Sequence, residues 1–148
     1  MIWCDDMDKK DLAVMFSKKS DHWSTPKDLY NLFVDKLGYY DPNPLYANSF
    51  DFKPRDMNMF INPPYSDIKT WVDYAINNHY MFHRRMLLLV PSRTDTIWFH
   101  KLLDYGCIFY FFKGRLKFGD GKGSAPFPSV LVELRNTEQS SIKRYNMV

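Results

Sequence analysis

The chain has 148 residues, a net charge of +3 and an aromatic content of 18%. This length predicts a single domain, 1–148, that can bury about two-thirds of the surface its unfolded chain would expose. The charge is too small to mark a nucleic-acid-binding protein by itself, although a local basic strip could still contact phosphate. Cys4 and Cys107 have no paired spacing, which argues against a disulfide scaffold and against a zinc module.

Targeting and membrane signals are also missing from the sequence. No stretch approaches the roughly 20 apolar residues of a membrane span, and no N-terminal run resembles a signal peptide. We therefore expect a cytoplasmic protein that has no membrane partner.

The N-terminal part of the chain predicts an arm followed by a helix. Residues 1–15 are dense in charge and are expected to form a flexible arm. A helix then starts with Thr25 as its N-cap, Pro26 in its first turn and Asp28 completing a capping box. Apolar residues follow at helical spacing until Gly38, which is expected to end the helix.

Two short strands separated by a loop are predicted next. Tyr39 and Tyr40 open the first strand, and a stretch rich in Asn, Pro and Asp follows it. Residues 57–61 form an apolar run typical of a buried strand. Ser66 or Asp67 is then expected to cap a second helix.

The clearest strand in the sequence is the apolar run 86–90, which belongs in the middle of a parallel sheet because both of its faces are apolar. A helix is predicted to open at Thr94 and Asp95 and to end at Gly106. The aromatic run 107–112 predicts another strand. This alternation of strands and helices indicates right-handed β-α-β crossovers.

After residue 112 the pattern changes to pairs of strands. Strands are predicted over 116–118 and 129–134, on either side of a glycine-rich loop over 119–123. From residue 136 the chain is polar, and 136–148 are expected to form a tail. The predicted fold class is thus α/β, with a mostly parallel sheet that has an antiparallel C-terminal edge.

The residues that follow the predicted strand 57–61, Asn62-Pro63-Pro64-Tyr65, could hold an exocyclic amino group. The amino nitrogen of adenine is a poor nucleophile because its lone pair is delocalised into the ring, so an enzyme that alkylates it must accept hydrogen bonds from its N–H groups. The Asn62 side chain and the Pro63 carbonyl can accept them, and Tyr65 can stack on a base flipped out of a duplex. Asn-Pro and Pro-Pro are also ordinary turn formers, so the tetrapeptide could instead only connect a strand to a helix.

A metal site is not expected. His79 and His83 have the i, i+4 spacing of two ligands on one helix, but no third ligand lies nearby in the sequence. The methyl donor suited to the Asn62 motif would be a sulfonium, which requires no metal.

Five segments in a fixed order carry a resemblance to a known family. They are FSKKSDHWSTP (16–26), INPPYSDIKTWV (61–72), LLLVPSRTDTIWFH (87–100), GRLKF (114–118) and APFPSVLV (125–132). Together they resemble the phage DNA N6-adenine methyltransferases of the Dam type. The resemblance implies a Rossmann-like methyltransferase fold, S-adenosylmethionine as donor and adenine in double-stranded DNA as acceptor. It also implies a location in the host cytoplasm if the protein is viral, and a role in shielding a genome from restriction.

The resemblance also implies roles for single residues. The catalytic motif is matched by Asn62, Pro63, Pro64 and Tyr65. The donor would be bound by the W-x-T-P residues and by the residues after the first strand, namely Trp23, Thr25, Pro26, Asp41 and Pro42. DNA would be contacted by Lys113, Arg115, Lys117, Phe118, Lys122 and Phe127.

One departure from the family pattern concerns the donor site. Methyltransferases of this fold usually have a glycine-rich turn after the first strand, but residues 39–44 contain no glycine. Only 21 positions (62 − 41 = 21) separate Asp41 from Asn62, too few for two further β-α units. The sequence therefore predicts either a reduced sheet or a reorganised donor site.

Methyl transfer to the N6 of adenine in DNA is the leading prediction, and alternatives remain open. The same chemistry could act on RNA or on a protein amide. The chain could also be a DNA-binding protein of the same ancestry that has lost cofactor binding. The basic residues around 113–122 could form only a solvated face, in which case Lys18, Lys19 and Lys27 would supply the DNA-binding surface.

Overall fold

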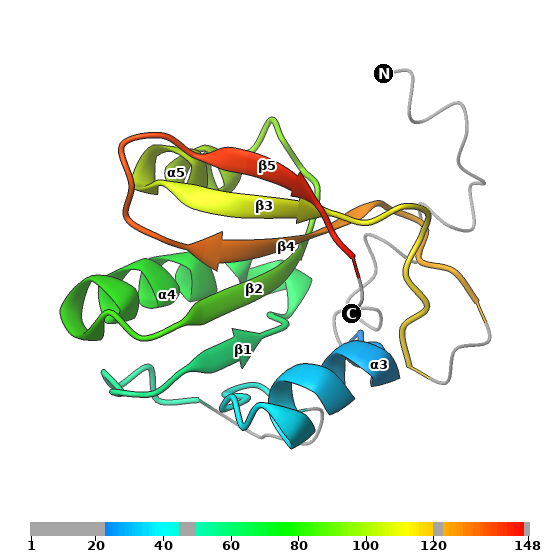
Figure 1. Ribbon diagram of the computed structural model, residues 1–148, viewed down its shortest axis with the longest axis horizontal. Coiled ribbons are helices and arrows are strands. Elements are labelled where there is room, and N and C mark those ends of the chain that lie inside the picture. Colours follow the sequence, from blue (N-terminus) through cyan, green and yellow to red (C-terminus); the bar gives the residue numbers. More distant parts are fainter. Residues whose placement is uncertain (1–22, 45–49, 120–122, 147–148) are drawn as a thin grey trace.

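The structure is a computed structural model that describes residues 23–44, 50–119 and 123–146. These residues form an α/β fold around a five-stranded mixed sheet with the strand order β1-β2-β4-β3-β5 (Figure 1). The strands are β1 (Met59–Ile61), β2 (Met86–Pro91), β3 (Cys107–Phe111), β4 (Ser129–Leu134) and β5 (Ser141–Arg144). β1 pairs with β2 and β3 pairs with β5 in parallel, whereas β4 is antiparallel to both β2 and β3. Four strands therefore run in one direction and only β4 runs against them.

The position of β4 corrects the expectation of an antiparallel C-terminal edge. β4 lies inside the sheet, between β2 and β3, and five of its six residues are buried. The edge is formed instead by β5, whose four residues are all exposed. Residues 136–148 are thus not only a polar tail, because 141–144 form this edge strand. The polar composition of β5 fits an edge position, where one side of the strand meets water.

A second correction concerns residues 116–118, which do not form a strand. The segment is held by single backbone hydrogen bonds, from Ala125 N to Leu116 O (2.8 Å) and from Gly119 N to Ser24 O (3.1 Å). Phe118 buries its ring in an aromatic cluster. The apolar residues of 116–118 therefore serve packing rather than strand pairing.

The two faces of the sheet pack against different helices, as Figure 1 shows. One face carries α4 (Ile68–Phe82) and α5 (Ile97–Tyr105), and its core includes Val72 and Leu102. The other face carries α3 (Lys27–Tyr30), which continues as a π-helical segment over Asn31–Lys36. We call this second side of the sheet the α3 face. Side chains of each central strand alternate between the two faces, which explains why β2 is apolar throughout.

Two helices start differently from the prediction. α5 begins at Ile97 with Thr96 as its N-cap, rather than at Thr94 and Asp95. The N-cap of α3 is Pro26, without a side-chain cap, and Thr25 does not form a capping box with Asp28. The Thr25 hydroxyl instead accepts a hydrogen bond from the Asn62 side chain. At the other end of the helical segment Gly38 has a φ of +72°, as its predicted role in ending the helix requires.

The predicted strand at Tyr39 and Tyr40 is reduced to a single parallel bridge, between Tyr40 and Met59. The bridge aligns Tyr40 with β1, so Asp41 and Asn62 follow neighbouring, parallel segments. Parallel segments end on the same edge of a sheet. This edge holds the candidate site.

Within the described part of the chain, no helix combines the length and the apolar character needed to cross a membrane.

Candidate active site

The side chain of Asn62 lies at the carboxyl end of β1 and is 8% exposed. Its Nδ2 donates hydrogen bonds to the Trp23 carbonyl oxygen (2.5 Å) and to the Thr25 hydroxyl oxygen (3.2 Å). A backbone carbonyl can only accept, so the amide nitrogen must face Trp23 and the amide oxygen must face away from it. That oxygen, Oδ1, is buried and has no hydrogen-bond partner among the described residues. A buried acceptor left in this state costs free energy unless a ligand supplies a donor.

The backbone of the motif is held by the loop that follows the Tyr40 bridge. Asn43 Nδ2 donates to the Asn62 carbonyl oxygen (3.0 Å), and the Asn43 backbone N–H donates to Asp41 Oδ1 (2.9 Å). Asp41 therefore caps a turn, and through Asn43 it is connected to the motif. Burial raises the pKa of Asp41, although the hydrogen bond from Asn43 lowers it. Sequence reasoning missed Asn43, because an Asn in a loop rich in Asn and Pro carries no distinguishing signal.

Tyr65 contributes an aromatic surface beside Asn62. Its ring lies 6.4 Å from the Trp23 ring at an angle of 27° and 5.1 Å from the Phe127 ring at 82°. Burial raises the pKa of Tyr65 well above its ordinary value, and the positive charge of Arg93 opposes this only in part. The phenol therefore stays neutral at ordinary pH and offers a ring rather than a base.

Trp23, Tyr65, Phe118 and Phe127 form one aromatic cluster next to the Asn62 side chain. Trp23 contacts Phe118 (5.7 Å) and Phe127 (5.5 Å), and those two rings lie 6.1 Å apart. Phe118 and Phe127 are almost fully buried. Their rings therefore pack inside the protein and are not exposed on its surface.

Two further polar atoms of this region are buried without a partner among the described residues, Trp23 Nε1 and Ser129 Oγ. Ser129 opens β4 opposite Pro91, at the carboxyl end of β2. Because side chains alternate along a strand, Ser129 shares the α3 face with Leu131. Sequence reasoning had no cause to single out Ser129, since a serine at the start of a strand is ordinary.

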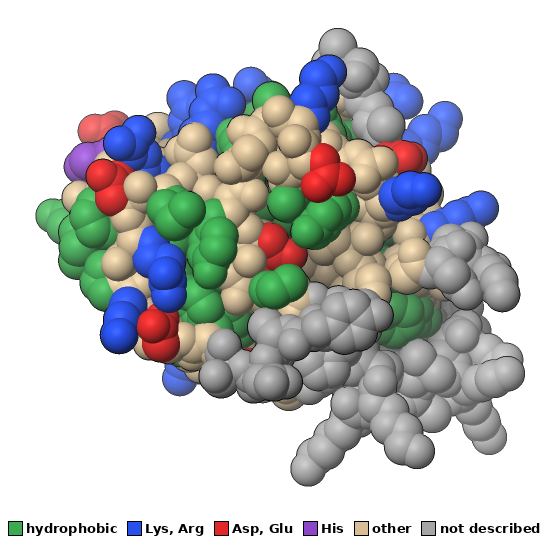
Figure 2. Space-filling model, turned by 90° about the horizontal axis from the view of Figure 1, so that it is seen from below, with side chains coloured by type: hydrophobic (Ala, Val, Ile, Leu, Met, Phe, Trp, Pro, Cys, Tyr) green, Lys and Arg blue, Asp and Glu red, His purple; other side chains and the backbone are tan. Residues whose placement is uncertain are grey.

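Positively charged side chains are spread over the face of the molecule seen in Figure 2. On the face seen in Figure 2, Lys and Arg side chains lie among Asp and Glu side chains rather than in one continuous strip. The predicted residues Lys113, Arg115 and Lys117 do line one common groove, on the α3 face. Lys122 lies outside the described residues.

His79 lies in α4, and His83 is the C-cap that follows this helix. His79 Nδ1 lies 2.6 Å from the Tyr105 hydroxyl, which links α4 to α5. Burial lowers the pKa of His79, and the neighbouring His83 lowers it further. Among the described residues, no group of three potential metal ligands occurs.

The comparison with known proteins identifies one family. Residues 46–140, well over half of the chain, match the family described as DNA N-6-adenine-methyltransferase (Dam). No curated protein and no solved structure matches the chain. The matched range contains the Asn62 motif, β1 to β4 and the basic segment after β3, whereas Trp23, Thr25 and Asp41 precede it. The chain belongs to the DNA N-6-adenine-methyltransferase (Dam) family.

Proposed function

We propose that this protein transfers a methyl group from S-adenosylmethionine to the N6 amino group of adenine in double-stranded DNA. Membership of the Dam family supports the reaction class. The observation that carries the proposal is the Asn62 amide oxygen, which is buried, fixed in orientation by Trp23 and Thr25, and without a donor among the described residues. The N–H of an adenine amino group would satisfy it.

In this reaction the residues of the motif would make the amino nitrogen a better nucleophile. Asn62 Oδ1 would accept one N–H and the Pro63 carbonyl the other, which draws the nitrogen lone pair out of conjugation with the ring. S-adenosylmethionine supplies the methyl group as an electrophile on sulfur. N6 would take the methyl group as the sulfur leaves with the bonding electrons as a neutral thioether, and the proton released from N6 would pass to solvent. Pro64 would fix the loop, and Tyr65 with its aromatic neighbours would hold the plane of the base.

The donor would be bound at the same sheet edge, in a reduced Rossmann-like arrangement. Ligands of open α/β sheets lie at the carboxyl ends of their strands, where Asp41 and Asn62 are found. The Asp41 carboxylate fits a donor-binding role because it is partly buried and its pKa is raised, so a ligand hydroxyl or amino group would stabilise its charge. Pro42, Trp23, Thr25 and Pro26 complete the proposed set around it.

DNA contacts are proposed for the segment that follows β3. Lys113, Arg115 and Lys117 are exposed and close in sequence, which suits contacts with phosphate. Phe118 and Phe127 would wall the pocket of the flipped base. Lys122 is assigned to the same surface on its sequence position alone.

A second candidate function is a DNA-binding protein that does not use the donor. It is favoured by the absence of glycine from residues 39–44 and by the engagement of Asp41 with Asn43. Titration of S-adenosylmethionine into the protein, followed by calorimetry, separates the two. Saturable binding supports the enzyme, and no binding supports the second candidate.

Incubation with tritiated donor and DNA, followed by nucleoside analysis, tests the proposed reaction. We expect N6-methyladenine, and we expect Asn62→Ala to lower kcat by orders of magnitude with little change in DNA affinity, since Oδ1 acts mainly in the transition state. Asn77→Ala, on the exposed surface of α4, is the matched control. Label in RNA or protein but not in DNA would overturn the acceptor, and full activity of Asn62→Ala would overturn the motif.

A further inference from the structure

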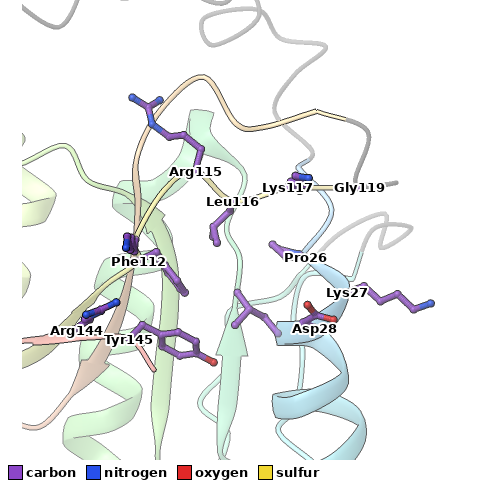
Figure 3. Close-up of a pocket in the computed structure, with 12 residues that line it drawn as sticks. Pro26, Lys27, Asp28, Phe112, Arg115, Leu116, Lys117, Gly119, Arg144 and Tyr145 are labelled. Atoms are coloured by element: carbon purple, nitrogen blue, oxygen red, sulfur yellow. The ribbon is translucent and has the colours of Figure 1, made fainter. Parts of the chain in front are cut away.

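A groove of about 860 Å³ lies on the α3 face, between α3 and the segment that follows β3 (Figure 3). We call it the basic groove. Its lining comes from three separate parts of the chain: Pro26, Lys27, Asp28 and Leu29; Phe112, Lys113, Arg115, Leu116, Lys117 and Gly119; and Arg144 and Tyr145. A cavity of this size is in the range of pockets that hold a small organic ligand, and a DNA duplex is too wide to enter it.

The rim of the basic groove is strongly positive. It holds five cationic side chains and one carboxylate, that of Asp28. None of the five forms an ion pair with another described residue. In Figure 3 the Lys27 and Arg115 side chains point outward, away from the space between the sheet and α3, so their charges lie at the outer edges of the groove. Cations on both walls suit a polyanion better than a single phosphate ion.

The floor of the basic groove is apolar and aromatic. Phe112 and Tyr145 lie 4.8 Å apart with an angle of 44° between their rings, and both are half-buried. Figure 3 shows these rings and Leu116 pointing into the space between the sheet and α3. A cationic rim above an aromatic floor matches the two parts of a nucleotide, the phosphate and the base.

The basic groove is connected to the Asn62 site through the backbone. Gly119, at one end of its lining, donates a hydrogen bond to the carbonyl of Ser24. Ser24 stands between Trp23 and Thr25, the two residues that hold the Asn62 amide. A DNA strand that places one base beside Asn62 would therefore have its neighbouring nucleotides near the groove.

We propose that the basic groove binds a single-stranded stretch of DNA, with phosphates on the rim and one base on the Phe112–Tyr145 floor. That the bound polymer is DNA rests on the proposed function, whereas the shape and charge of the groove are observed independently of it. The groove would hold a nucleotide other than the one to be methylated, and so would keep the target strand separated from its complement.

Fluorescence anisotropy with short labelled oligonucleotides tests this proposal. Single-stranded DNA should bind roughly fivefold to a hundredfold more tightly than an abasic strand of equal length, because stacking contributes about 1–3 kcal/mol per base. Tyr145→Leu should remove most of this difference, whereas Tyr80→Leu, at a tyrosine that is 67% exposed on α4, should leave it unchanged. Equal affinity for the two strands, or no effect of Tyr145→Leu, would overturn the proposal.

A second pair of variants tests the wall formed by α3. Lys27→Gln should weaken binding of single-stranded DNA severalfold, whereas Lys36→Gln, at the far end of the same helical segment and outside the groove, should not. Equal effects of the two substitutions would contradict a site in the groove. Efficient competition by inorganic phosphate, which has no base, would show a site for a free anion and would also overturn the proposal.

The same titrations on Asn62→Ala separate this proposal from the proposed reaction. Tyr145-dependent binding in that inactive variant supports the groove even if no methylation is found in the wild type. Methylation without Tyr145-dependent binding refutes the groove and leaves the reaction standing.

Discussion

At the scale of single residues, the orientation of the Asn62 amide depends on groups outside the strand that delivers it. The Trp23 carbonyl and the Thr25 hydroxyl both precede α3, far from β1 in sequence. An asparagine at the end of a strand could otherwise turn its amide by half a rotation, and Oδ1 would then face Trp23. The W-x-T-P segment therefore decides which atom of Asn62 a ligand meets.

Substitution of Thr25 tests this positioning role. Thr25→Val keeps the shape but removes the acceptor, and we expect kcat for methylation to fall about fivefold, the effect of one hydrogen bond of about 1 kcal/mol, with KM for DNA nearly unchanged. Thr25→Ser keeps the hydroxyl and should restore most of the activity. Comparable losses in both variants would show that the threonine matters for packing and not for the Asn62 amide.

Asp41 gives a prediction that depends on pH. Burial raises its pKa above the ordinary value of 3.8, so the folded state binds protons more readily than the unfolded state. The charged carboxylate therefore lowers the free energy of unfolding at neutral pH, and this cost disappears as pH falls through the raised pKa toward 3.8. Asp41→Asn should thus be more stable than the wild type at pH 7 and lose this advantage on acidification, as measured by urea unfolding.

The same substitution should weaken donor binding. The side-chain amide that Asp41→Asn introduces would keep an acceptor for the Asn43 backbone but would carry no charge. A site that uses the carboxylate should therefore show a higher Kd for S-adenosylmethionine in calorimetry. An unchanged Kd together with the expected stability difference would assign Asp41 to turn capping alone.

At the scale of elements, the turn from α5 to β3 is a tightly packed connection. Gly106 has a φ of +89°, and a Cβ built on it would lie 2.0 Å from the Thr137 carbonyl oxygen. Its own carbonyl accepts a hydrogen bond from Arg135 N (3.0 Å). The end of α5 therefore rests directly on the connection between β4 and β5, and only glycine fits there.

Paired glycine substitutions test this contact. Gly38 also has a positive φ, +72°, but a Cβ there would meet no atom within 4 Å. Gly38→Ala should cost about 1 kcal/mol of unfolding free energy from backbone strain, and Gly106→Ala should cost clearly more because Thr137 must move. Chemical denaturation of the two variants provides the measurement, and equal losses would show that the turn can shift without cost.

The elements also show what could be predicted from the sequence. β2 and β4 were predictable because an apolar run bounded by Pro or Gly is a local signal, and residues 62–65 were placed correctly at the end of a strand. The insertion of β4 between β2 and β3 could not be predicted from the sequence, because strands that pair across long sequence distances leave no local pattern. Thr25 was misassigned as a cap for a similar reason, since its actual partner is 37 positions away.

At the scale of the whole molecule, the net charge of +3 provides little overall attraction for DNA, so binding must depend on local groups of cationic side chains. Lys117→Gln should weaken duplex binding to a similar extent on all sequences and make the slope of log K against log salt shallower by about one unit. Lys36→Gln changes the net charge equally and should leave the slope unchanged. A slope that Lys117→Gln does not alter would move the duplex contact away from this segment.

The central position of β4 has a consequence for how the chain is made. β1 and β2 can pair as soon as they leave the ribosome, but β3 has no place beside them until residues 129–134 arrive. The same late segment brings Phe127 against Tyr65 and Trp23. A nascent chain that stops short of residue 127 therefore exposes one edge of β2 and lacks a wall of the site, so synthesis has to reach the last third of the protein before either is complete.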